Sequence, residues 1–202
     1  MKRHNTDIEI VHWDYLVLHQ VWPPGHCSTG KCRFVKQDFL IGGLWAILYP
    51  GKRLENCGGA PYYDAVKSHE WYKFGACMYD RLLVKDAPDY FNLACSLKKR
   101  CATLDKLKSA GFIPSSQVAY SSTKINEVLN DVYRRNVKIS CRRSSNDKQY
   151  LQDIRICYNH ALNMIDCPKH YPRRRSVTED DHEFQFRACR DLIYIADFDS
   201  QD

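Results

Sequence analysis

The chain has 202 residues and a net charge of +6, from 30 Lys and Arg against 24 Asp and Glu. Apolar residues make up 44% and charged residues 27%, which excludes wholesale disorder. No uncharged apolar run approaches the roughly 20 residues that a membrane-spanning helix needs, so we expect no membrane span. The modest positive charge permits a polyanionic partner without requiring one. The length favours a single domain over residues 1–202.

Cysteine is unusually frequent: the chain holds ten, and no two form a Cys-x-x-Cys pair. Zinc fingers and thioredoxin-like sites need that close spacing, so we expect neither a metal nor a cofactor. An even number at irregular spacing favours five disulfides and an oxidising compartment, so the sequence predicts a secreted protein. The alternative is a cytosolic protein with ten reduced thiols.

The first half of the chain predicts two strands and then helices. Over residues 13–22 the side chains alternate between two faces that are both mostly apolar, which indicates a strand that is largely covered on both sides. Pro23-Pro24-Gly25 ends this strand, and residues 39–45 form a second apolar run. Residues 62–76 are compatible with a helix, and residues 89–108 with a helix in two pieces around Cys101.

The second half predicts one clear helix and three strands. After the hydroxyl residues 121–123, apolar side chains at positions 125, 128, 129, 132 and 133 form one helical stripe. Residues 137–141, 154–158 and 190–196 are typical of strands, and residues 168–181 of a solvated loop. Because strands and helices do not alternate regularly, the fold class predicted is α+β.

Three segments occur in an order that resembles the T2 ribonuclease family of secreted endoribonucleases. They are LHQVWP at 18–23, FLIGGLW at 39–45 and HEWYKFGAC at 69–77, the last two matching that family's active-site motifs. The resemblance covers most of the chain. It implies one domain with a central, mainly antiparallel sheet, packed by helices and stabilised by disulfides.

The resemblance also defines what the site lacks. In the family, one His in each motif transfers a proton while the ribose 2′-hydroxyl attacks the phosphorus, giving a 2′,3′-cyclic phosphate. Gly42 and Phe74 stand at those two positions, and neither side chain titrates. Each such group contributes roughly 10²–10⁴ to the rate, so the resemblance predicts lost or greatly reduced activity. His69, Glu70 and Lys73 remain from the second motif, and they are the residues that would support a phosphate.

The sequence therefore predicts a catalytically inactive member of the family, a pseudoenzyme that binds RNA or a protein surface such as a receptor, as an effector does. The candidates for contact with RNA are Gln20, Trp45, His69 and Lys73. For Trp45 a place in the core is favoured over base stacking, and His69 and Glu70 are equally compatible with a scaffold role.

The alternative is a weak or altered RNA endonuclease that still gives 2′,3′-cyclic phosphates. It would recruit His69 together with His19 or His26 as a substitute pair. Such an imidazole must lie within hydrogen-bond reach of the reacting oxygen.

The disulfide pattern of the family carries over by position to four cysteine pairs. The two cysteines that remain, Cys95 and Cys101, would then pair with each other by elimination. On a straight helix six residues rise about 9 Å, beyond the roughly 7 Å limit for bridged Cα atoms, so that helix would have to break before Cys101. The four pairs implied by the resemblance are Cys27–Cys32, Cys57–Cys77, Cys141–Cys189 and Cys157–Cys167.

Overall fold

The computed structural model describes residues 11–27, 37–60, 68–80, 82–144, 147–168 and 188–198. In this part of the chain the fold is α+β, as the sequence predicts, and no helix is long and apolar enough to cross a membrane. The strands are β1 (Tyr15–Val21), β2 (Leu40–Leu48), β3 (Lys52–Arg53), β4 (Ser115–Ser121), β5 (Lys138–Arg143), β6 (Gln149–Tyr158), β7 (Met164–Ile165) and β8 (Leu192–Ile195). The helices are α1 (Pro23–His26), α2 (Ser68–Lys73), α3 (Ala87–Cys101), α4 (Thr103–Ser109) and α5 (Ser122–Tyr133), with a 3₁₀ turn, η1 (Gly75–Met78).

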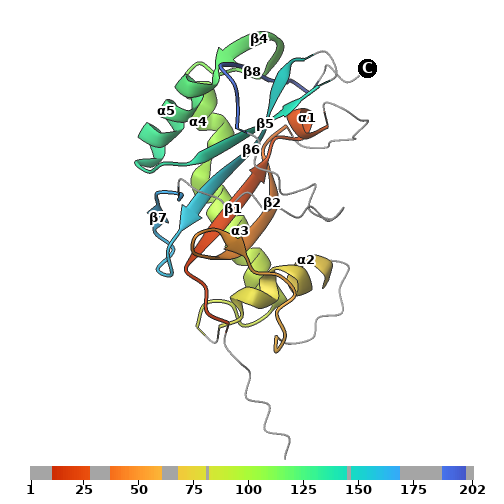
Figure 1. Cartoon of the computed structure of the whole chain (residues 1–202), viewed down its shortest axis with the longest axis vertical. Coiled ribbons are helices and arrows are strands. Elements are labelled where there is room, and N and C mark those ends of the chain that lie inside the picture. Colours follow the sequence, from red (N-terminus) through yellow and green to blue (C-terminus); the bar gives the residue numbers. More distant parts are fainter. Residues whose placement is uncertain are drawn as a thin grey trace, which may run out of the picture.

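One sheet organises the molecule. Its main path runs β3-β2-β1-β6-β8-β4, and β5 and β7 also pair with β6 (Figure 1). The paired strands are antiparallel apart from β6 and β8, which meet in parallel at Tyr150 and Tyr194. Strand β1 lies between β2 and β6, and its residues from Leu16 to Val21 pair with both neighbours. The mainly antiparallel sheet expected from the sequence is therefore present.

Strand β1 separates two cores because its side chains alternate between the faces of the sheet. Leu16, Leu18 and Trp22 point to the face covered by the helices and join the large core. Tyr15 and Val17 point to the other face and join a smaller core. The prediction that both faces of this strand are covered is confirmed.

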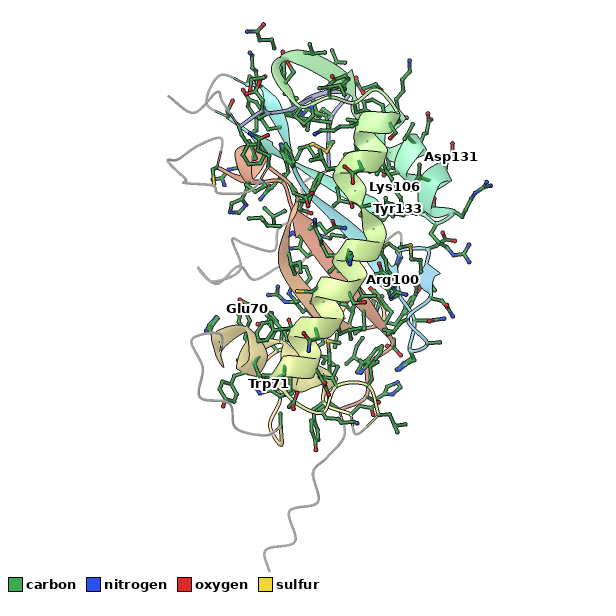
Figure 2. All side chains as sticks on the ribbon, turned by 180° about the vertical axis from the view of Figure 1, so that it is seen from behind. Glu70, Trp71, Arg100, Lys106, Asp131 and Tyr133 are labelled. Atoms are coloured by element: carbon green, nitrogen blue, oxygen red, sulfur yellow. A yellow bond between two sulfur atoms is a disulfide. The ribbon has the colours of Figure 1, made fainter. Side chains whose placement is uncertain are left out.

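Helices α3 and α4 follow one another along the helical face of the sheet, where Figure 2 marks Arg100 on α3 and Lys106 on α4. They are separated by Ala102, whose φ of +45° is left-handed and interrupts the helix. The side chain of Asp86 caps α3 by accepting a hydrogen bond from the Asp89 amide at 2.9 Å. The predicted division into two helices is confirmed, although the break follows Cys101 instead of preceding it.

Some elements were not predicted. Strand β1 ends before Pro23, as predicted, but Pro23 also begins the short helix α1, a position where a missing amide hydrogen costs nothing. Strands β3, β4 and β7 also had no clear apolar pattern, since their residues are mostly half-exposed. Of the helix predicted over residues 62–76, the structure shows α2, and residues 62–67 lie outside the described residues.

The disulfides follow the family pattern where both partners are described. The structure contains Cys57–Cys77, Cys141–Cys189 and Cys157–Cys167. Cys27 is buried, but its predicted partner, Cys32, lies outside the described residues, as does the predicted loop over 168–181 beyond residue 168.

The predicted pair Cys95–Cys101 is wrong. Both cysteines are free: Cys95 is exposed and Cys101 is buried. Helix α3 continues without a break from Ala87 to Cys101, so six residues of helical rise keep the two sulfur atoms apart. The Cys101 thiol instead lies 3.2 Å from the Tyr158 hydroxyl, and burial raises its pKa.

Candidate functional site

Gly42 lies in an irregularity of strand β2 where the first motif meets β1. His19 pairs with Gly43 and Gln20 pairs with Ile41, so Gly42 is the extra residue of a bulge. Gly42 is exposed. A Cβ atom on it would lie 2.4 Å from the Nδ1 atom of His19 and 2.6 Å from a methyl carbon of Val21. The present arrangement therefore has no room for a side chain at this position.

His19 fills the space beside Gly42. Its ring stacks on Trp45, with ring centroids 4.5 Å apart and planes inclined by 27°. The Nε2 atom of His19 lies 3.5 Å from a carboxylate oxygen of Asp153 on strand β6, and the residue is only 7% exposed. The structure thus brings one of the three histidines proposed as substitutes to the first motif.

Phe74 stands at the end of the second motif, directly after α2, and is 5% exposed. Its ring centroid is 6.1 Å from that of Trp45, and the guanidinium of Arg53 lies 4.6 Å from the Phe74 centroid and 5.0 Å from the Trp45 centroid. The ammonium of Lys73 lies 5.3 Å from the same Phe74 ring. His19, Trp45 and Phe74 form what we call the aromatic row, and two cations lie against it.

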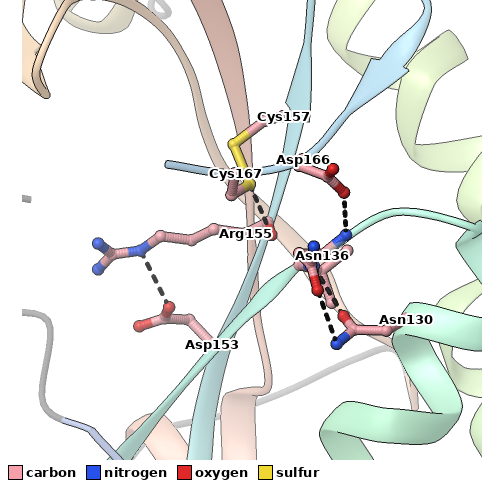
Figure 3. Close-up of a disulfide and its surroundings, with 8 residues drawn as sticks. Asn130, Asn136, Asp153, Arg155, Cys157, Asp166 and Cys167 are labelled. Carbon is pink, nitrogen blue, oxygen red and sulfur yellow. Dashed lines mark hydrogen bonds and ion pairs between the residues drawn. A yellow bond between two sulfur atoms is a disulfide. The ribbon is translucent and has the colours of Figure 1, made fainter. Parts of the chain in front are cut away.

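Asp153 is the buried anion of the site. It accepts a hydrogen bond from the Ser140 hydroxyl, and its other oxygen lies 3.2 Å from Nε of Arg155. Figure 3 shows Asp153 and Arg155 extending from β6 on the same side of the strand. Burial alone would raise the pKa of Asp153, but the imidazole of His19, the charge of Arg155 and the Ser140 hydroxyl together lower it to about 2. The carboxylate is therefore ionised at all physiological pH values.

The second motif combines structural residues with exposed polar ones. Trp71 is fully buried in the large core, and a Cβ on Gly75 would lie 2.6 Å from the Trp71 ring, so a glycine is required there. His69 is exposed and Glu70 half-buried on α2, where Figure 2 marks Glu70 and Trp71. Packing in the core thus explains the presence of Trp71 in the motif, whereas the exposed His69 has no such structural reason.

The four candidates for contact with RNA do not form one group. Gln20 is fully buried on the helical face of the sheet, where its side-chain oxygen accepts a hydrogen bond from the Thr103 hydroxyl at 3.0 Å. Trp45 is 3% exposed in the opposite core, which favours the core role left open above. His69 and Lys73 lie on the surface helix α2, one turn apart. Of the four, Trp45 belongs to the aromatic row and Lys73 lies against it.

The sequence did not identify Arg53, Ser140, Asp153 or Arg155 as residues of the site. A signal was present in β6, because Asp153 and Arg155 are charged residues at alternate positions on either side of the apolar Ile154. No such signal marks Arg53, which reaches the site through the pairing of β3 with β2. His26 ends α1, and its carbonyl accepts a hydrogen bond from Arg142 at 2.7 Å.

Comparison with known sequences assigns the chain to a protein family. The sequence profile of the Ribonuclease T2 family matches residues 60–167, more than half of the chain, so the chain belongs to this family. Ribonuclease S-7 of Nicotiana alata is 24% identical over 186 residues, which cover 77% of this chain and 82% of that one. Ribonuclease T2 of Sus scrofa is 25% identical over 185 residues, which cover 78% and 90%.

Solved structures show the same fold. RNase NT, in a complex with 5′-AMP, superposes with a TM-score of 0.74 at 22% identity and covers 93% of this chain and 100% of its own. An RNase-related protein from Calystegia sepium has a TM-score of 0.72 at 18% identity, and the match covers 92% and 98%. The fold described above is therefore that of T2 ribonucleases.

Proposed function

We propose that this member of the T2 ribonuclease family binds RNA without cleaving it. The main support for the proposal is the identity and packing of Phe74. A ring without a titrating group stands where the family has its second imidazole, and it is packed against Trp45 and Arg53. Gly42 adds no proton-transfer group at the first motif.

The charges around the aromatic row support an anionic ligand. Arg53 and Lys73 lie against Phe74, whereas Arg155, on the same face of the sheet, is fully buried beside Asp153. Glu55 and Asp153 offset part of this charge, through ion pairs with Arg53 and Arg155. An RNA phosphate suits such a cationic site, and the chain as a whole is positive by six charges.

Contact through phosphates and ribose is better supported than contact through bases. Trp45 is buried by its neighbours His19 and Phe74, so its faces are not available for stacking on a base. Binding of this kind tolerates many sequences and depends steeply on salt. RNase NT is described in complex with 5′-AMP, and this likeness in fold supports a nucleotide ligand here.

One observation favours a second function, a weak or altered RNA endonuclease. His19 places an imidazole next to Gly42, at 2.4 Å from the position of a Cβ atom there. Cleavage needs a second proton-transfer group, however, and Phe74 cannot supply one. A cyclic-phosphate product would establish this second function.

We infer a secretory location. The three disulfides fit an oxidising compartment, and relatives in the T2 ribonuclease family match most of the chain.

The test is binding of a short fluorescent oligouridylate, measured by anisotropy at about 50 and about 200 mM salt. We expect binding that weakens steeply with salt, weakens again in Arg53→Gln, and is unchanged in the control Lys124→Gln, an exposed Lys on α5. RNA recovered from the mixture should be intact on a denaturing gel. No binding at low salt would contradict the proposal and would point to a protein partner.

A further inference from the structure

The side chain missing from residue 42 has been replaced in space by one from the neighbouring strand. Strand β1 presents His19 directly opposite the bulge of β2. Its Nδ1 lies 2.4 Å, and its Cε1 2.9 Å, from where the Cβ of residue 42 would be. Non-bonded heavy atoms do not approach so closely, so a side chain at 42 and the present position of His19 exclude each other.

The imidazole of His19 is held in one orientation. Trp45 stacks on one side of the ring, and Asp153 lies 3.5 Å from Nε2. Asp153 is in turn fixed by Ser140 and by Arg155. A carboxylate beside one ring nitrogen of a histidine helps to fix the orientation of the ring.

Both ring nitrogens of His19 are buried, and neither makes a hydrogen bond to any residue that the structure describes. Nε2 has the carboxylate of Asp153 at 3.5 Å, whereas Nδ1 faces the position that a side chain at residue 42 would occupy. The groups facing the ring from the elements packed against it are Asp153 and Arg155 on β6, Ser140 on β5 and Trp45 on β2. Because a buried polar nitrogen without a partner costs free energy, it points to a group that is absent from the protein chain itself.

We propose that His19, oriented by Asp153, takes the place of the imidazole that residue 42 lacks and hydrogen-bonds through Nδ1 to the ribose 2′-hydroxyl of bound RNA. The proposal rests on the RNA binding proposed above. It assigns one of the two proton-transfer groups of the family's reaction to a residue on a different strand. Phe74 is then the one position at which the reaction lacks an imidazole.

Cleavage of RNA by this reaction needs two proton transfers, and His19 accounts for only one of them. The 2′-oxygen forms a bond to phosphorus while the bond from phosphorus to the 5′-oxygen breaks. One imidazole receives the 2′-hydroxyl proton, and a second, protonated imidazole gives a proton to the departing 5′-oxygen. His19 is placed for one of these transfers, so the single substitution Phe74→His should supply the other.

Cleavage of oligouridylate by three variants tests this assignment. Phe74→His should release 2′,3′-cyclic phosphate products, and adding His19→Val should reduce the rate by about 10²-fold or more. Adding Gly42→His should not increase the rate, because its Cβ would displace His19. The control His160→Val, which changes a histidine that stacks on Trp13, should leave the rate unchanged. Equal rates with and without His19, or no cleavage by Phe74→His, would overturn the assignment.

The wild-type chain offers a second measurement that does not depend on the stability of these variants. The 2′-hydroxyl is the group by which a protein distinguishes RNA from DNA, so wild type should bind oligouridylate more tightly than oligodeoxyuridylate. His19→Val should bind both equally. If His19→Val retains the preference, the role of His19 is contradicted while RNA binding stands. If wild type binds neither oligonucleotide, the proposed function itself is contradicted.

Discussion

The two faces of the central sheet have different contents although they share the same strands. The helical face packs an almost entirely apolar core against α3, α4 and α5, with Leu18 of β1 at its centre. The other face has a small apolar core and, beside it, the buried groups His19, Asp153 and Arg155. Burying ionised groups stabilises a fold less than packing apolar side chains of similar volume. The comparison therefore separates a face that mainly stabilises from a face that retains chemistry.

Removing the two disulfides that belong to these cores should cause the largest losses in the free energy of unfolding. Cys141–Cys189 lies at the helical-face core and closes 48 residues, whereas Cys157–Cys167 lies in the site-face core and closes 10. Replacing both cysteines of a pair by Ser should cost about 4 kcal/mol for the first and about 3 kcal/mol for the second. Urea denaturation followed by tryptophan fluorescence measures both. A larger loss from the second pair would contradict the ranking.

Leu18 and His19 are neighbours on β1 but point to opposite faces of the sheet, so substituting each one compares the stability that the two faces contribute. Leu18→Ala should lower the free energy of unfolding by roughly 3 kcal/mol, because it opens a cavity in the core covered by the helices. His19→Val should lower it less, since it removes a polar group and fills most of the same volume. The same denaturation experiment decides, and a greater loss from His19→Val would show that the site face carries the stability.

Acid should affect the site face selectively. The pKa of Asp153 falls from 3.8 to about 2 on folding, so its carboxylate contributes stability above about pH 4 that is lost as the pH falls towards 2. The amount is about 2 kcal/mol, from a shift of slightly under two pH units at 1.36 kcal/mol each. Asp153→Asn should flatten the dependence of unfolding free energy on pH in this range. An unchanged slope in that variant would mean that other carboxylates are responsible.

The smallest effect should come from the cation over the aromatic row. Arg53→Gln removes its guanidinium from above Trp45 and Phe74 and should cost about 1 kcal/mol. The adjacent Lys52→Gln, an exposed position on the same short strand, serves as the control and should cost nothing measurable. Equal losses in the two variants would show that the contact adds no stability of its own.

Much of the fold could be predicted from local pattern. The alternation in β1 and the capped apolar stripe of α5 are both properties of neighbouring residues, and the side chain of Ser121 does accept a hydrogen bond from the Lys124 amide. Strand β4 could not be predicted this way, because its residues are half-exposed and it pairs only with β8. The pair Cys95–Cys101 failed because it required a helix break before Cys101, and α3 is continuous to that residue.

The candidate site was predictable in part. The order of the motifs identified Gly42 and Phe74. The structure places Gly42 beside His19 and the ring of Phe74 near that of Trp45. The encounter of His19 with Gly42 depends on strand register and on a one-residue bulge, which sequence spacing does not encode. Asp153 comes from the far half of the chain and reaches His19 only because β6 pairs with β1.

Incubation of the wild-type protein in excess over oligouridylate, at about pH 5 and about pH 7, tests the absence of cleavage most directly. A mock preparation carried through the same purification controls for contaminating nuclease. With Phe74 in place, the RNA should remain intact and cyclic-phosphate ends should stay at the level of the mock preparation. Cyclic-phosphate ends that accumulate above that level, in proportion to the protein added, would contradict the account.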